Sequence, residues 1–155
     1  MAVVAAVGID LGTSSAVIAA CRKGGVDILD NEVSNRLTPC YVGFGDKDRA
    51  IGERGLGEFA RAPTNTCTNV QRLLGRKFDE AEIDAIEKQY ITCKLSGGEN
   101  GDILANVKFA GEAREFTPEA LAAMLMVQLG DIIEVHPPKA SIDACCSCPL
   151  PTPPC

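Results

Sequence analysis

The sequence lacks three features that mark common classes of protein: an excess of positive charge, a long uninterrupted hydrophobic segment, and more than one histidine. Its formal net charge of −6 gives no electrostatic reason to expect binding to nucleic acid or to an anionic membrane. The N-terminal hydrophobic run has no basic residues before it and is interrupted by Gly8 and Asp10, which argues against a secretory signal and a membrane span. We therefore expect a cytoplasmic protein with neither nucleic acid nor membrane as a partner.

Cysteine, by contrast, is plentiful. Four of the eight cysteines stand singly among apolar or small neighbours, as buried free thiols usually do: Cys21, Cys40, Cys67 and Cys93. The other four crowd the C-terminus: Cys145, Cys146, Cys148 and Cys155. A soft metal could bind there, but the cluster lacks two Cys-x-x-Cys pairs, and the one histidine, His136, stands beside two prolines. We favour an irregular Pro/Cys-rich tail over residues 149–155.

The stretch from Val3 to Ile18 carries the clearest local signal. A continuous hydrophobic run predicts a strand buried on both faces, a polar turn follows Asp10, and a second hydrophobic run predicts the next strand. Gly12 allows a tight turn and a close approach to a ligand. Hydroxyl groups then join the backbone N–H groups of the turn, which suits a bound phosphate: Thr13, Ser14 and Ser15.

Asp10, at the end of the first strand, is the candidate ligand for a magnesium ion that accompanies the phosphates. Magnesium sheds its hydration shell reluctantly, so Asp10 is expected to hold it through water. The same residues also fit a β-hairpin whose turn happens to be polar, and the motif alone leaves both interpretations open.

Hydrophobic periodicity and turn residues predict further strands. The length of 155 residues fits one domain, and 46% hydrophobic with 23% charged residues is typical of a globular protein. A third strand at 26–29 would complete an antiparallel meander. Other strands are expected at 41–44, paired with 49–52, and at 142–146, and a hairpin is expected over 107–116.

Capping and stop signals predict one long helix and several short ones. The long helix has a hydroxyl cap at Thr117, a proline at its first position and a stop at residues 137–138. Its expected buried stripe is Leu121, Met124, Leu125, Leu129, Ile132 and Ile133. Shorter helices are expected near Gly55, over 66–74 with a stop at Gly75, and from Asp79, where Glu82 would be the capping partner. The face expected for the last of these is Ile83, Ile86 and Tyr90.

Residues 55–60 match the dinucleotide-binding pattern G-x-G-x-x-A. No buried strand leads into them, and no strand–helix–strand unit with an acidic ribose partner follows. We interpret the segment as the start of a short helix that ends before Pro63.

In chain order, these segments resemble the N-terminal part of the Hsp70 superfamily, and within it the Hsp110 branch. The resemblance covers about residues 3–145, and its matching segments are Val7–Thr13, Asn31–Pro39, Val42–Gly45, Arg49–Gly52, Pro63–Thr66, Arg72–Arg76 and Val107–Glu112. The segments 31–36 and 42–45 favour Hsp110, and they argue against another actin-like ATPase such as a sugar kinase, which shares the Asp-x-Gly-Thr turn.

The resemblance implies an α/β fold, namely a truncated actin-like ATPase lobe of the ribonuclease H-like type. The lobe would occupy residues 1–148, with an inserted α+β subdomain at about 37–116. In this family ATP or ADP, with Mg, binds in a cleft between two lobes. By position, Asp10 is similar to the magnesium-side carboxylate. The first phosphate loop would be Gly12, Thr13, Ser14 and Ser15, with Thr13 near the γ-phosphate.

Two departures from the family pattern limit what the resemblance implies. Gln71 stands where the family usually has a catalytic lysine, and a neutral amide cannot neutralise the charge that develops in phosphoryl transfer. A second phosphate loop, an adenosine-binding segment and a substrate-binding domain are not recognisable. The Cys/Pro-rich end also departs from the family, and we attribute it to a shifted reading frame, an altered splice or a premature stop.

The function expected from the resemblance is that of an ATP-binding lobe of an Hsp70/Hsp110-type chaperone or nucleotide exchange factor. Unfolded client proteins and co-chaperones would be the partners of a full-length product. Because one lobe offers one wall of contacts, this chain alone should bind Mg·ATP weakly or not at all. The alternative is a non-catalytic interaction module derived from such a lobe.

Overall fold

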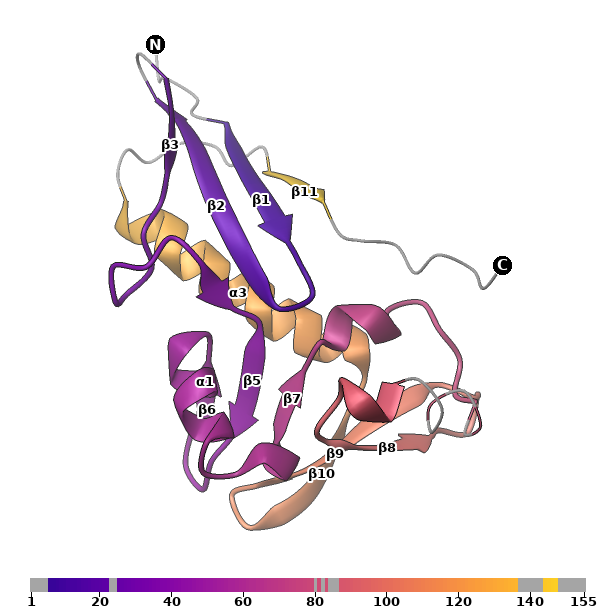
Figure 1. The fold of residues 1–155 in the computed structure, drawn as a ribbon. Helices are drawn as coiled ribbons and strands as arrows, with labels where there is room; N and C mark the ends of the chain where they lie inside the picture. Colours follow the sequence, from indigo (N-terminus) through magenta and orange to yellow (C-terminus); the bar gives the residue numbers. More distant parts are fainter. Residues whose placement is uncertain are drawn as a thin grey trace.

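The computed structural model describes residues 6–22, 25–79, 81, 83, 87–136 and 144–147, with Arg22, Lys88 and residues 144–147 described by their backbone alone. The described residues form three β-sheets, one long helix and several short helical segments (Figure 1). The expectation of a mixed α/β chain is confirmed. The predicted tail, Glu82, Ile86 and the side chains of the C-terminal cysteines lie outside the described residues.

The largest sheet contains the N-terminal meander. Its strands are β1 (Val7–Leu11), β2 (Ser15–Arg22), β3 (Gly25–Ile28), β4 (Thr38–Pro39) and β11 (Ala144–Ser147). The order is β11-β1-β2-β3, and β4 also pairs with β2. The β1 strand runs antiparallel to β2 and parallel to β11, with Val7 opposite Ala144. The meander and the C-terminal strand both follow the sequence prediction.

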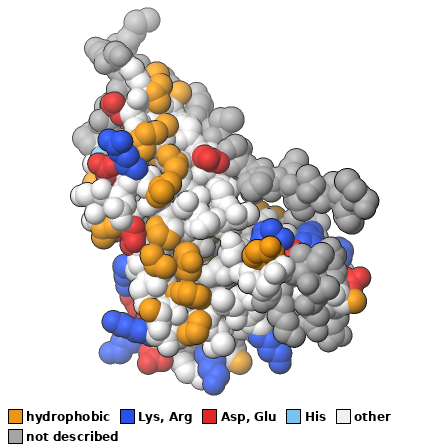
Figure 2. Space-filling view, in the orientation of Figure 1, with side chains coloured by type: hydrophobic (Ala, Val, Ile, Leu, Met, Phe, Trp, Pro, Cys, Tyr) orange, Lys and Arg blue, Asp and Glu red, His pale blue; other side chains and the backbone are white. Residues whose placement is uncertain are grey.

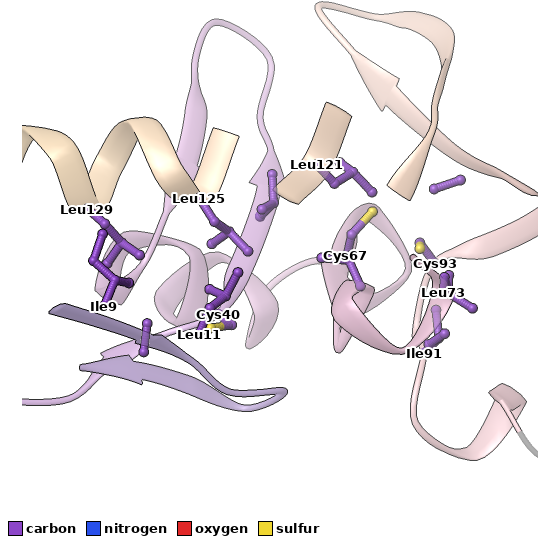
Figure 3. Close-up of a cluster of buried hydrophobic side chains, with 14 of the residues drawn as sticks. Ile9, Leu11, Cys40, Cys67, Leu73, Ile91, Cys93, Leu121, Leu125 and Leu129 are labelled. Atoms are coloured by element: carbon purple, nitrogen blue, oxygen red, sulfur yellow. The ribbon is translucent and has the colours of Figure 1, made fainter. Parts of the chain in front are cut away.

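The β1 strand is buried on one face. Val7, Ile9 and Leu11 are buried, whereas Gly8 and Asp10 are exposed. The expectation of burial on both faces was wrong, because α3 (Pro118–Val135) packs against the face of Ile9 and Leu11 while the side of Asp10 stays open (Figure 3).

The long helix α3 begins and packs as its sequence predicts. Thr117 caps it, since its hydroxyl oxygen accepts a hydrogen bond of 3.3 Å from the backbone N–H of Ala120. Four residues of the expected stripe are buried: Leu121, Leu125, Leu129 and Ile132. Met124 and Ile133 are partly buried against the same core. The stripe is therefore confirmed.

The second sheet follows the meander and carries α1 (Glu53–Phe59). Its strands are β5 (Tyr41–Phe44), β6 (Arg49–Ile51) and β7 (Thr66–Thr68), in the order β6-β5-β7. The helix lies so close to β5 that a Cβ at Gly55 would be 2.6 Å from the Tyr41 carbonyl oxygen. The first glycine of the G-x-G-x-x-A pattern thus lets α1 pack closely against β5. This agrees with the interpretation of the segment as a short helix.

The third sheet contains the predicted hairpin. Its strands are β8 (Lys94–Gly97), β9 (Ile103–Phe109) and β10 (Glu112–Phe116), in the order β10-β9-β8. Ala110 and Gly111, which join β9 to β10, both have positive φ angles, of 53° and 80°. Such a pair matches the twist of the flanking strands.

The helix predicted over 66–74 was wrong, whereas the one predicted from Asp79 is confirmed at its start, where the Asp79 carboxylate accepts a hydrogen bond of 3.0 Å from the Ala81 N–H. Residues 66–74 form the strand β7 and the 3-10 helix η2 (Val70–Leu73), separated by Asn69 with φ of 53°, because pairing with β5 outweighs local helix propensity. The stop at Gly75 is confirmed by its φ of 73°. Tyr90 is exposed directly after the 3-10 helix η3 (Glu87–Gln89), so it does not share a buried face with Ile83. Another 3-10 helix, η1 (Pro63–Asn65), directly precedes β7.

Candidate functional site

The turn between β1 and β2 brings together five of the six residues that the sequence singles out. Asp10 is exposed near the end of β1, opposite Val17 of β2. A Cβ at Gly12 would lie 2.7 Å from the Ser15 carbonyl oxygen, a distance that real Cβ atoms essentially never show. Glycine is therefore required for this turn to close, as predicted.

The start of β5 anchors the turn from outside. The backbone N–H of Cys40 donates to the Ser14 carbonyl at 2.9 Å, and its thiol donates to the Gly12 carbonyl at 3.4 Å. The Thr13 side chain is half-buried, Ser14 is exposed, and neither hydroxyl is hydrogen-bonded to the described part of the chain. Cys40 thus fixes two carbonyls of the turn, while the Thr13 and Ser14 hydroxyls remain available to hydrogen-bond a ligand.

An open groove begins at this turn. Ser14 and Ser15 line it together with residues of the loop from Asp30 to Leu37 and with Glu53 of α1. Within the loop, the Arg36 guanidinium lies 3.9 Å from an Asp30 carboxylate oxygen, and both side chains are largely exposed. Ser14 and Ser15 therefore share this groove with one positive and two negative groups.

Gln71 lies on η2 and is fully buried, with an exposed fraction of 0%. Its side chain is therefore not that of a solvent-facing helix residue. Neither its amide nitrogen nor its amide oxygen has a hydrogen-bond partner among the described residues. Leaving a buried polar group unsatisfied costs about 1–3 kcal/mol. No described hydrogen bond joins Gln71 to the turn.

A buried ion cluster holds η2, and sequence reasoning did not find it. Glu87, only 1% exposed, accepts hydrogen bonds from Arg72 at 2.8 and 3.2 Å and from Arg76 at 2.7 Å. Burial disfavours the charged carboxylate, but the hydrogen bonds from the two arginines outweigh it and lower the pKa of Glu87. The Arg72 guanidinium also stacks on the Tyr90 ring at 4.4 Å. Gln71 is thus on a fixed segment.

The residues of the turn fit the phosphate and magnesium part of a nucleotide. A carboxylate at an exposed strand end, a glycine turn that a Cβ would obstruct and adjacent hydroxyls are the donor set that such a group needs. Among the described residues, no group of three or more His, Cys, Asp or Glu side chains could itself hold a metal ion. No helix in the described ranges is both long and apolar enough to cross a membrane.

The fold and the turn together define part of a nucleotide-binding domain. Comparison with known proteins gives the family: the Hsp70 protein family model matches residues 6–150. The chain belongs to the Hsp70 family.

Its relatives include Hsp110-type proteins. It is 36% identical over 143 residues to a heat shock protein homolog of Saccharomyces cerevisiae, a match that covers 92% of this chain and 20% of the relative. The chain is 42% identical over 117 residues to a heat shock protein homolog of Lachancea kluyveri, covering 76% of this chain and 17% of the relative. The chain is 38% identical over 146 residues to "Heat shock protein 88" of Dictyostelium discoideum, a match that covers 93% of this chain and 18% of the relative. The chain thus spans about a fifth of the length of these relatives.

Proposed function

We propose that this chain is the phosphate-side wall of the actin-like, ATP-binding lobe of an Hsp110-type chaperone or nucleotide exchange factor. The observation that carries the proposal is the Gly12 turn placed directly after the exposed Asp10. Unfolded client proteins, co-chaperones and a cytoplasmic location belong to the same proposal, for a product that contains the remaining parts of the relatives.

The residues have distinct roles in this proposal. Asp10 holds the water shell of the magnesium ion, and the ion, when bound, offsets the negative charge of the phosphates. The backbone N–H groups of the turn and the Thr13, Ser14 and Ser15 hydroxyls donate to phosphate oxygens. Gly12 keeps the turn tight enough for them to converge.

Gln71 stands in place of the family lysine, and it would donate to a phosphate oxygen as a neutral group only once its fully buried amide is uncovered. Its orphaned amide supports a partner outside the described residues. Removing one positively charged group from a phosphoryl-transfer site costs about 10²-fold or more in rate. We therefore propose nucleotide binding with little or no hydrolysis by this chain.

Nuclear magnetic resonance titration of the 155-residue chain with a non-hydrolysable Mg·ATP analogue tests the proposal. Saturable shifts of the backbone signals of residues 10–15, with a dissociation constant in the millimolar range, are expected. Asp10→Asn should remove them, whereas Asp27→Asn, an exposed carboxylate on β3, should keep them. Saturable shifts that spare residues 10–15, or that survive Asp10→Asn, would refute the proposal.

A second candidate function, the non-catalytic interaction module, is favoured by the exposed apolar surface. Figure 2 shows hydrophobic side chains gathered along one face of the molecule. Among the residues that the structure describes, the large hydrophobic ones exposed by more than half are Val26, Val33, Leu37, Val127 and Val135. If Asp10→Asn left chaperone binding in cell extract unchanged, and Val26→Ser with Leu37→Ser abolished it, this second function would replace the first.

A further inference from the structure

Cys67 and Cys93 form a thiol pair in the core, away from the β1–β2 turn. Cys67 is the central residue of β7, and Cys93 directly precedes β8. Each thiol is the largest influence on the pKa of the other, as expected for two adjacent side chains. Figure 3 shows the two sulfur atoms turned toward one another between Leu73 and Leu121.

Threonine hydroxyls fix the two backbones beside each other. Thr92 donates its hydroxyl to the Thr66 carbonyl at 2.6 Å, and Thr68 donates its hydroxyl to the Tyr90 carbonyl at 3.0 Å. These bonds hold the residues on both sides of Cys67 and the chain that leads into Cys93. A disulfide requires Cβ atoms about 3.5–4.5 Å apart, and two sulfurs that face each other from tethered backbones suit that requirement.

We propose that Cys67 and Cys93 are a redox-responsive pair that a hydroperoxide converts into an intramolecular disulfide. The inference is independent of nucleotide binding at the turn. The disulfide would link Cys67 of β7, which lies four residues before Gln71, to Cys93, which directly precedes β8.

The two thiols have different roles in the reaction. The neighbouring Cys67 lowers the pKa of Cys93, while the neighbouring Cys93 and burial raise the pKa of Cys67. Cys93 also keeps 5% exposure, whereas Cys67 has none. Cys93 is therefore the thiol that ionises and meets the oxidant first.

The reaction balances as a two-electron oxidation. The Cys93 thiolate attacks one oxygen of hydrogen peroxide, the O–O bond breaks, and the released hydroxide takes a proton to become water. The Cys67 sulfur then attacks the sulfenic sulfur of Cys93, loses its proton, and displaces the sulfenic hydroxyl as a second water. Two thiols lose two electrons and two protons, and one peroxide becomes two waters.

Peptide mapping on the wild-type chain tests the proposal without a variant. The folded chain is exposed to hydrogen peroxide for increasing times, then free thiols are blocked with N-ethylmaleimide and the chain is digested with trypsin. Cleavage at Arg61, Arg72, Lys88 and Lys94 places Cys67 on peptide 62–72 and Cys93 on peptide 89–94. We expect these two peptides to appear cross-linked, two hydrogens lighter than their sum, and to separate with dithiothreitol.

Cys40 is the internal control, because it is a buried thiol like Cys67 and Cys93. The pair should lose its free thiols at least tenfold faster than Cys40, and oxidation should raise the midpoint of thermal unfolding by several degrees, since the disulfide closes a loop in the unfolded chain. Cys67→Ala and Cys93→Ala should each abolish the linked peptide and the shift. Loss of the Cys67 and Cys93 thiols no faster than Cys40, or peroxide-induced linkage of either residue chiefly to another cysteine, would overturn the proposal.

Discussion

Glu87 accepts a hydrogen bond of 2.7 Å from Arg76, which lies eleven residues earlier in the chain, and the carboxylate is almost fully buried. A second arginine, Arg72, donates to the same carboxylate. Two cations and one buried anion thus fix η2, the segment that carries Gln71. Removing the anion takes from both guanidinium groups the carboxylate that they share, and breaking a buried ion pair in this way is strongly destabilising.

Glu87→Gln should lower the free energy of unfolding by about 2–3 kcal/mol at pH 7. The arginines are partly exposed, which keeps the cost at the lower end of the range for buried pairs. Urea unfolding followed by circular dichroism measures the loss. Glu112→Gln, which breaks the exposed pair with Arg114, is the matched control and should cost less than about 1 kcal/mol. Equal losses in the two variants would contradict a structural role for the buried pair.

The same pair makes stability depend on pH in the acid range. The pKa of Glu87 is lower in the folded chain than its ordinary value of 4.5, so the unfolded chain binds the proton more readily. The contribution of Glu87 is therefore complete above about pH 5 and is lost as the pH falls through the folded pKa. Glu87→Gln should reduce the fall in unfolding free energy between pH 5 and pH 3. An unchanged slope would show that other carboxylates carry the acid sensitivity.

Gly12→Ala should destabilise the chain, because its Cβ would lie 2.7 Å from the Ser15 carbonyl oxygen. A strained turn costs about 1–3 kcal/mol, and thermal unfolding measures it. Gly8→Ala is the control: it lies two residues before Asp10 on the same strand, and a Cβ there has nothing within 4 Å. That variant should be neutral or slightly more stable. If the two alanine variants unfolded at the same temperature, the turn would not require glycine at residue 12.

Thr117→Ala should cost about 1 kcal/mol, because it removes the acceptor that satisfies the Ala120 N–H at the start of α3. Thr117→Ser keeps the hydroxyl and should restore most of the loss. Chemical denaturation of the two variants separates capping from packing. Equal destabilisation by alanine and serine would mean that the methyl group of Thr117, and not its hydroxyl, supports the helix.

Local signals in the sequence suffice for α3 and for the β1–β2 turn. A hydroxyl cap, a proline at the first position and a periodic apolar stripe are all local, and Gly12 is the residue that the turn requires. The segment 66–74 shows the limit of this reasoning. Its first part, Thr66–Thr68, is a strand only because β5 offers a partner, with Val42 opposite Cys67, and that partner lies more than twenty residues away.

The buried ion cluster could not be predicted from the sequence for the same reason. Arg72 and Arg76 are four residues apart, which suggests one exposed face, and nothing near them indicates a carboxylate at Glu87. The Cys67–Cys93 contact depends on the same return of the chain beside β7. Contacts between distant segments decide which polar groups are buried, so local patterns miss them.

Gln71 offers the sharpest test that joins stability to ligand binding. Its amide is fully buried with no described partner, so Gln71→Leu, which is of similar volume, should raise the free energy of unfolding by about 1–3 kcal/mol. Gln89→Leu, on the exposed end of η3, is the control and should change stability by less than about 0.5 kcal/mol. Destabilisation by Gln71→Leu would show that the amide has a partner in the free chain.

Gln71→Lys should have the opposite effect, because it buries a positive charge without a partner and lowers stability in the absence of ligand. A ligand that binds the folded chain alone raises its stability by mass action. If Gln71 faces bound phosphate, Mg·ATP at millimolar concentration should stabilise Gln71→Lys by a larger margin than the wild type, because the lysine gains its counter-charge. Thermal unfolding with and without the nucleotide measures this difference. Equal stabilisation of the two chains would show that residue 71 does not contact bound phosphate and that the buried Gln71 amide belongs to the core alone.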